Sequence, residues 1–162
     1  MLRFYLDTSA MLKHYVTEPG TEIMDTIYDK AETGDLSITI SLWNIGEFLG
    51  ALDQKRRRGW LSEKEFERLE KNFADELLKF IRLKSIEIIP VQTQILTETW
   101  NVLMNYHLYE ADALQIATCI ESKNDALISS DEKLVDASRK NGLKALHISK
   151  DENDLIALIN KS

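Results

Sequence analysis

Residues 2–10 have the sequence LRFYLDTSA, in which a short apolar run ends in an acid and two hydroxyl residues. The run at residues 2–6 predicts a buried β-strand, because it is short and mostly apolar. An acid that ends a buried strand is costly unless a partner compensates its charge. Asp7 is therefore the first candidate functional residue.

Four more stretches are short, apolar or β-branched, and predict strands at residues 36–40, 86–90, 126–129 and 145–148. Helical stretches long enough for crossover connections separate them. Alternating strands and helices predict an α/β fold with three α/β/α layers, in which a mostly parallel sheet of about five strands is covered on both faces. We expect a single domain over residues 1–162.

A helical hairpin is predicted at about residues 41–85, inserted between two strands. An apolar face predicts the first helix between Ser41 and Arg58, Gly59 is a suitable stop, and Ser62–Arg82 predicts the second helix. The apolar face consists of Trp43, Ile45, Phe48 and Leu52.

Three Ser-x-x-Glu patterns predict capping boxes at helix starts, because a hydroxyl and a carboxylate can satisfy opposite ends of a first turn. They are Ser62 with Glu65, Ser129 with Glu132, and Ser149 with Glu152. Helical spacing is also present from Ile95 to Leu103 and over Tyr109–Ser122, with a break near His107.

The composition is that of an ordered globular protein, with 44% hydrophobic and 29% charged residues. The 27 acidic against 20 basic residues argue against a protein that coats nucleic acid by bulk electrostatics. Local phosphate binding is still compatible with this balance. Lys55, Arg56, Arg57 and Arg58 form the densest basic run and are the candidate RNA contacts, with a solvated helix end as the alternative.

Cys119 is the only cysteine, which excludes an intrachain disulfide and a cysteine-based zinc site. Its apolar neighbours predict a buried thiol. No stretch approaches the roughly 18 apolar residues that a membrane span needs, so we expect no membrane association. These features together favour a cytoplasmic protein.

Four acids are candidate ligands of a hard divalent cation. Asp7 and Asp131 follow the first and fourth predicted strands, and ligand sites of parallel sheets lie beyond the carboxyl ends of the strands. Asp112 falls in a first helical turn and Glu47 about two turns into a helix. Alternatively, Asp112 and Asp131 only stabilise helix starts, and Glu47 is solvated. The hydroxyls of Ser9 and Ser129 either cap helices or orient a ligand carboxylate or water.

The ordered set of motifs resembles the PIN-domain nucleases and, within them, the VapC-type toxins of toxin–antitoxin pairs. The matching stretches are residues 5–10, Glu18–Gly20, Glu47 in its helix, residues 107–117 and residues 127–134. The resemblance implies that Asp7, Glu47, Asp112 and Asp131 are catalytic and bind metal, and that Ser129 stands where the family often has Thr. It also implies hydrolysis of RNA that leaves a 5′-phosphate and a 3′-hydroxyl.

An all-oxygen ligand set suits Mg²⁺ or Mn²⁺ better than zinc. The expected activity is thus that of a metal-dependent endoribonuclease. The resemblance implies an RNA substrate, a cognate antitoxin and a homodimer. Apolar residues on the hairpin, such as Trp43, Trp60 and Phe66, are candidates for these protein interfaces.

Three other functions remain open at the level of sequence. One is a PIN ribonuclease with a housekeeping role, and another is a PIN scaffold that only binds. The third is an aspartyl-phosphate phosphotransferase or receiver with Asp7 as nucleophile. The haloacid-dehalogenase pattern places a second Asp two residues after the first, where this chain has Ser9. His14, His107 and His147 lack ligand spacing and are expected to be structural.

Overall fold

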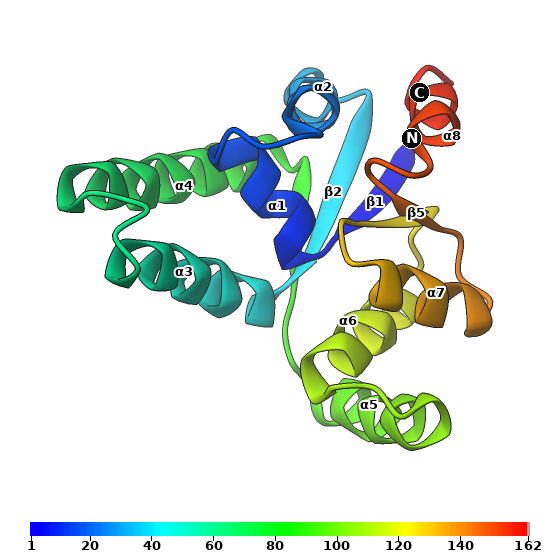
Figure 1. The fold of residues 1–162 in the computed structure, drawn as a ribbon. Helices are drawn as coiled ribbons and strands as arrows, with labels where there is room; N and C mark the ends of the chain where they lie inside the picture. Colours follow the sequence, from blue (N-terminus) through cyan, green and yellow to red (C-terminus); the bar gives the residue numbers. More distant parts are fainter. Residues whose placement is uncertain (162) are drawn as a thin grey trace.

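The central sheet contains five parallel strands in the order β3-β2-β1-β4-β5 (Figure 1). In this computed structural model, which describes residues 1–161, the strands are β1 (Leu2–Leu6), β2 (Leu36–Ser41), β3 (Ile86–Ile89), β4 (Ala126–Ser129) and β5 (Ala145–His147). Each strand lies within one residue of its predicted bounds. The predicted parallel sheet is therefore confirmed, and β1 occupies its centre.

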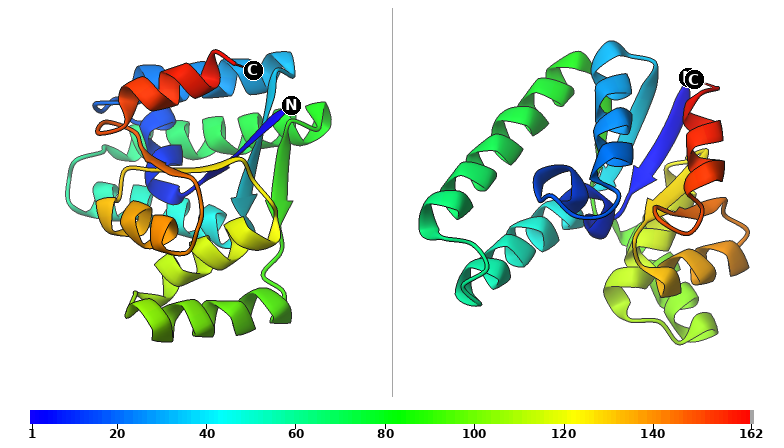
Figure 2. Two further views of the ribbon diagram at one scale, coloured as in Figure 1. Left: turned by 90° about the vertical axis from the view of Figure 1, so that its right-hand side faces the viewer. Right: turned by 45° about the horizontal axis from the view of Figure 1, so that its top comes forward.

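The strands are connected by helices that lie on both sides of the sheet (Figures 1 and 2). The helices of the described residues are α1 (Thr8–Tyr15), α2 (Thr21–Thr33), α3 (Leu42–Arg57), α4 (Glu63–Leu83), α5 (Thr93–Tyr106), α6 (Glu110–Glu121), α7 (Glu132–Lys140) and α8 (Glu152–Ile159). None of these helices is long and apolar enough to cross a membrane.

Alternating side chains of β1 enter different core clusters on the two faces of the sheet. Phe4 and Leu6 pack with residues of α1, α2, α3, α4 and α8, whereas Tyr5 packs with α5, α6 and α7. This alternation is what a period of two residues requires of a strand that is covered on both faces. The three-layer α/β/α arrangement is confirmed. Cys119 is buried in the second cluster, as predicted, and burial raises the pKa of its thiol to about 12.

The helical hairpin is present as α3 and α4, inserted between β2 and β3. Its second helix begins with the predicted capping box, in which the Ser62 hydroxyl accepts a hydrogen bond from the Glu65 amide and the Glu65 carboxylate accepts one from the Ser62 amide. The turn between the helices contains Gly59 at φ +74°, a conformation that glycine adopts without strain.

The capping boxes predicted at Ser129 and Ser149 are wrong. The helix after β4 begins at Asp131, whose Oδ1 accepts hydrogen bonds from the amides of Lys133 and Leu134. Asp151 occupies the corresponding position before α8. In both places an acid immediately before the helix takes the cap position, and the serine two residues earlier is left for other contacts. An unpredicted capping box joins Ser41 and Asn44 at the start of α3.

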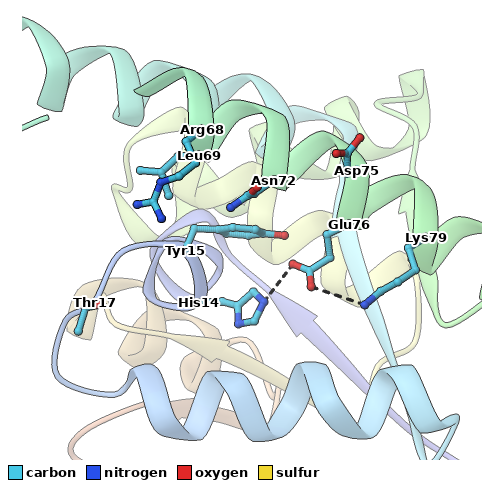
Figure 3. Close-up of a pocket in the computed structure, with 9 residues that line it drawn as sticks. All are labelled: His14, Tyr15, Thr17, Arg68, Leu69, Asn72, Asp75, Glu76 and Lys79. Atoms are coloured by element: carbon cyan, nitrogen blue, oxygen red, sulfur yellow. Dashed lines mark hydrogen bonds and ion pairs between the residues drawn. The ribbon is translucent and has the colours of Figure 1, made fainter. Parts of the chain in front are cut away.

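A hollow of about 540 Å³ separates α1 from α4, and His14 lies at its edge (Figure 3). His14 Nδ1 lies 2.6 Å from Asp25 Oδ1, and its Nε2 lies 3.0 Å from Glu76 Oε2. The ring also stacks on Tyr28, with 3.8 Å between ring centroids. Because both ring nitrogens face carboxylates, both must donate, and only the imidazolium can do this. His14 therefore ties α1 to α2 and α4 as a structural residue.

We expect His14→Gln to destabilise the protein most at acidic pH. Burial lowers the pKa of His14, but the hydrogen bonds and charges of Glu76 and Asp25 outweigh it, and the pKa is raised. The stabilisation is complete below the pKa of an unfolded-state histidine, about 6.5, and is lost as the pH rises through the folded-state pKa. Urea titrations should show a deficit of about 1–2 kcal/mol near pH 6 that shrinks toward pH 9. A deficit independent of pH would contradict this role.

Candidate functional site

The candidate site lies at the carboxyl edge of the sheet, beside β1. Asp7 directly follows β1 and caps α1. Ser129 is the last residue of β4, the neighbour of β1 in the sheet, and Asp131 caps the helix that follows. Parallel strands end at the same edge, so the chain brings these three residues together from positions more than a hundred residues apart.

Asp7 is buried, with 6% of its surface exposed, and its carboxylate is held by three donors. Its Oδ1 accepts a hydrogen bond of 2.9 Å from the amide of Ala10. The hydroxyls of Ser9 and Ser129 each donate to Asp7 Oδ2 at 2.9 Å. Burial raises the pKa of Asp7 to about 6, although these hydrogen bonds act in the opposite direction. Its partners are all uncharged, so its negative charge is stabilised only by dipoles.

Ser9 and Ser129 also accept hydrogen bonds from the loop that enters α7. The amide of Ser130 donates to Ser9 Oγ at 2.8 Å, and the amide of Asp131 donates to Ser129 Oγ at 2.9 Å. Each hydroxyl thus links the carboxylate of Asp7 to the backbone beside Asp131. Both serines were predicted candidates, and each contacts Asp7.

Glu47 lies on α3 and takes two hydrogen bonds on one oxygen. Thr8 Oγ1 donates to Glu47 Oε2 at 2.7 Å, and Gln115 Nε2 donates to the same oxygen at 3.0 Å. Thr8 follows Asp7 in sequence and Gln115 lies one helical turn after Asp112. Sequence reasoning missed Gln115, since nothing in its own helix marks the distant carboxylate that it contacts. The indication in the sequence that Gln115 has a specific polar contact is its position between two apolar residues that are buried.

Asp112 lies in the first turn of α6 and is half-buried. Burial is the largest cause that raises its pKa, and the negative charges of Asp131 and Glu47 raise it further, against the opposing charge of Lys133. Asp112 therefore lies in the electrostatic field of both Asp131 and Glu47. Asp7 is connected to the backbone of Asp131 through the hydroxyl of Ser129.

These acids do not form a ready coordination sphere. Within residues 1–161, no group of three or more His, Cys, Asp or Glu side chains lies close enough to hold a metal ion. Like charges repel, and each of three acids accepts hydrogen bonds from neutral donors of its own: Asp7 from the Ser129 hydroxyl, Glu47 from the Gln115 amide, and Asp131 from the backbone amide of Lys133. The chemistry of the donors, carboxylate and hydroxyl oxygens, fits Mg²⁺ or Mn²⁺.

A sequence profile of the PIN domain matches residues 4–140 of this chain. The chain belongs to the PIN domain family. The match runs from β1 to the end of α7 and so includes all four candidate acids. A search of curated proteins found no significant match.

Solved structures share this PIN fold at low sequence identity. FitAcB from Neisseria gonorrhoeae is 14% identical and covers 91% of this chain and 99% of its own, with a TM-score of 0.67. VapC20 from Mycobacterium tuberculosis, a toxin that cleaves the sarcin-ricin loop, is 13% identical over 89% and 98%, with a TM-score of 0.61. A toxin–antitoxin complex from Klebsiella pneumoniae is 16% identical over 78% and 85%, with a TM-score of 0.52. At these identities the likeness establishes the fold.

The basic run lies at the far end of α3 from Glu47. Eight residues of helix separate Glu47 from Lys55, or about 12 Å along the axis. Most of the run is engaged in ion pairs, which are Lys55 with Glu18, Arg56 with Asp53 and Glu63, and Arg57 with Asp53. Arg58 differs, because it lies over the ring of Trp60 and forms no ion pair within the described chain. Among the described residues of this PIN domain, Arg58 is thus the member of the run whose charge is not neutralised by a carboxylate.

Proposed function

We propose that this protein is a metal-dependent endoribonuclease that acts as the toxin of a toxin–antitoxin pair. The negative charges of Asp131 and Glu47 that act on Asp112, beside the buried Asp7, carry the proposal, because such a set of acids attracts a cation. The PIN family and the fold shared with toxins support the activity. A reducing cytoplasm suits its single, buried cysteine.

In this proposal Asp7, Glu47, Asp112 and Asp131 hold Mg²⁺ or Mn²⁺. When bound, the cation would supply an acidified water and stabilise negative charge on the leaving oxygen of an RNA phosphodiester. The chain's own contribution is to orient two of the carboxylates with uncharged donors. Ser9 and Ser129 hold the carboxylate of Asp7, and Thr8 and Gln115 hold that of Glu47. Because no three of the acids lie close enough to share an ion within residues 1–161, they would have to approach one another around it.

Asp7→Asn should reduce RNA cleavage at least ~100-fold, because it removes a negative charge at the centre of the metal site but keeps the volume of the side chain. Cleavage should also stop with a chelator and return with Mg²⁺. In addition, Mg²⁺ should raise the melting temperature of the wild type more than that of the variant, since binding stabilises the folded state. The matched control is Asp75→Asn on α4, an exposed acid paired with Lys71. Wild-type cleavage by Asp7→Asn would refute the metal mechanism.

We also propose that the basic run, Lys55–Arg58, contacts the RNA backbone mainly through Arg58. In the inactive Asp7→Asn background, Arg58→Ala should flatten the dependence of log K on log salt by up to ~0.7, the value for one phosphate contact with a single strand. Arg56→Ala should change it less, because Asp53 and Glu63 already neutralise that charge. Fluorescence anisotropy with a labelled single-stranded RNA measures both slopes. Equal slopes for wild type and Arg58→Ala would assign the run to the solvated hairpin tip.

A second copy of the chain is proposed to cover an apolar face on α3, α5 and α6. Trp43, Leu96, Trp100 and Tyr109 are exposed and line one hollow of about 290 Å³. Of the hairpin residues predicted for such interfaces, Trp43 belongs to this face. Trp60 is also exposed but lies at the hairpin tip beside Lys55 and Arg58, and Phe66 lies under Arg56. Large exposed apolar faces of this kind mark protein interfaces.

Sedimentation should show a dimer for the wild type and a monomer for Trp100→Glu, since a buried charge opposes association. Trp60→Glu at the hairpin tip is the control and should remain dimeric.

The antitoxin is proposed to place a basic side chain near Asp7 or Asp112, so that inhibition of RNA cleavage weakens as the Mg²⁺ concentration rises. A monomeric wild type that stays active beside the product of the neighbouring reading frame would instead indicate a housekeeping ribonuclease.

A further inference from the structure

A chain of buried hydrogen bonds runs from the end of β2 to Glu47. It begins at the amide of Ser41, which donates to Asn44 Oδ1 at 2.7 Å. This bond fixes the orientation of the Asn44 amide, because the oxygen faces the backbone and the nitrogen must face the other way. Asn44 Nδ2 then donates to Thr8 Oγ1 and to Gln115 Oε1, each at 3.0 Å.

Gln115 receives two donors on its amide oxygen. Besides Asn44, the hydroxyl of Tyr5 donates to Gln115 Oε1 at 2.6 Å. A carbonyl oxygen has two lone pairs, and both are engaged here. The amide nitrogen of Gln115 is consequently left to donate, and it does so to Glu47 Oε2 at 3.0 Å. The orientation of this amide follows from its partners.

Thr8 is directed in the same way. Its Oγ1 accepts from Asn44, so its own hydrogen is free to point at Glu47 Oε2, 2.7 Å away. Two donors thus converge on one oxygen of Glu47. No hydrogen bond to the other oxygen, Oε1, occurs within the described residues, and that oxygen remains for a ligand.

The network occupies space that an ordinary core fills with apolar side chains. Tyr5, Asn44 and Gln115 are all buried, between α3 and α6 at the end of β1. Buried polar groups are costly unless every one is satisfied. The Tyr5 hydroxyl has two acceptors, Gln115 Oε1 at 2.6 Å and, more distantly, Asn44 Oδ1 at 3.4 Å. The network runs from a backbone amide of the sheet toward a carboxylate at the candidate site.

We propose that Gln115 and Thr8 are positioning residues that hold the Glu47 carboxylate in a fixed orientation toward a divalent cation, with Asn44 setting the direction of both donors. The proposal rests on the proposed function, since it assigns Glu47 to the metal. It adds residues outside the set of acids, and it predicts that Gln115 acts only through Glu47.

The test is a double-mutant cycle between Gln115→Met and Glu47→Gln, read by Mn²⁺ calorimetry on the protein without RNA and by cleavage kinetics. Gln115→Met alone should weaken Mn²⁺ binding and lower kcat by about 10–100-fold, with the KM for RNA nearly unchanged. In the Glu47→Gln background the same change should have less than about a twofold effect on Mn²⁺ affinity, because the group it positions is already lost.

Thr8→Val is the second variant, which removes the other donor to Glu47 from a partly exposed position in case Gln115→Met does not fold. It should also weaken Mn²⁺ binding. The control is Thr99→Val, which removes a buried hydroxyl of α5 that bonds the carbonyl of Ile95 and should affect stability alone. Equal losses for Gln115→Met in both backgrounds would overturn the proposal as general destabilisation. A wild type that binds no Mn²⁺ and cleaves no RNA would overturn the proposed function as well.

Discussion

The buried carboxylate of Asp7 is the constraint around which this edge of the molecule is organised. It directly follows β1, the central strand. The last two residues of that strand, Leu6 and Tyr5, lie in different core clusters on opposite faces of the sheet. No lysine, arginine or histidine among the described residues pairs with the Asp7 carboxylate, so its charge depends on hydroxyls and an amide. One of those hydroxyls comes from Ser129 on the adjacent strand. The β1–β4 pairing and the entry to α7 are therefore coupled to one ionised group.

Two of the other acids are likewise held by uncharged donors. Glu47 is held by an amide and a hydroxyl, and Asp131 by backbone amides. Dipoles orient a carboxylate without cancelling its charge, whereas a paired lysine or arginine would neutralise it. The site therefore keeps its negative potential in a protein whose net charge is already −7. In the proposed ribonuclease, that potential would attract a cation and repel a bare polyanion.

Local patterns predicted the strands and the hairpin because the information for them is local. A β-branched or apolar run specifies a strand, and Ser62 with Glu65 specifies a helix start. The same pattern failed at Ser129, where an acid two residues later is the better cap and where the hydroxyl bonds Asp7, 122 residues away. Gln115 was missed for the same reason. Its partners lie on β1 and α3, and a single sequence does not show which residues far apart in the chain will be in contact.

Which cations of the basic run form ion pairs depends on tertiary contacts as well as on sequence spacing. Asp53 stands three and four residues before Arg56 and Arg57, so those pairs follow from helical spacing alone. Glu18 and Glu63 come from other elements, and only the fold brings them to Lys55 and Arg56. Three of the four cations of the run are thereby engaged in ion pairs among the described residues. In the proposed ribonuclease, a cation at the carboxylates would add to Arg58 the positive charge that an RNA backbone needs at this acidic surface.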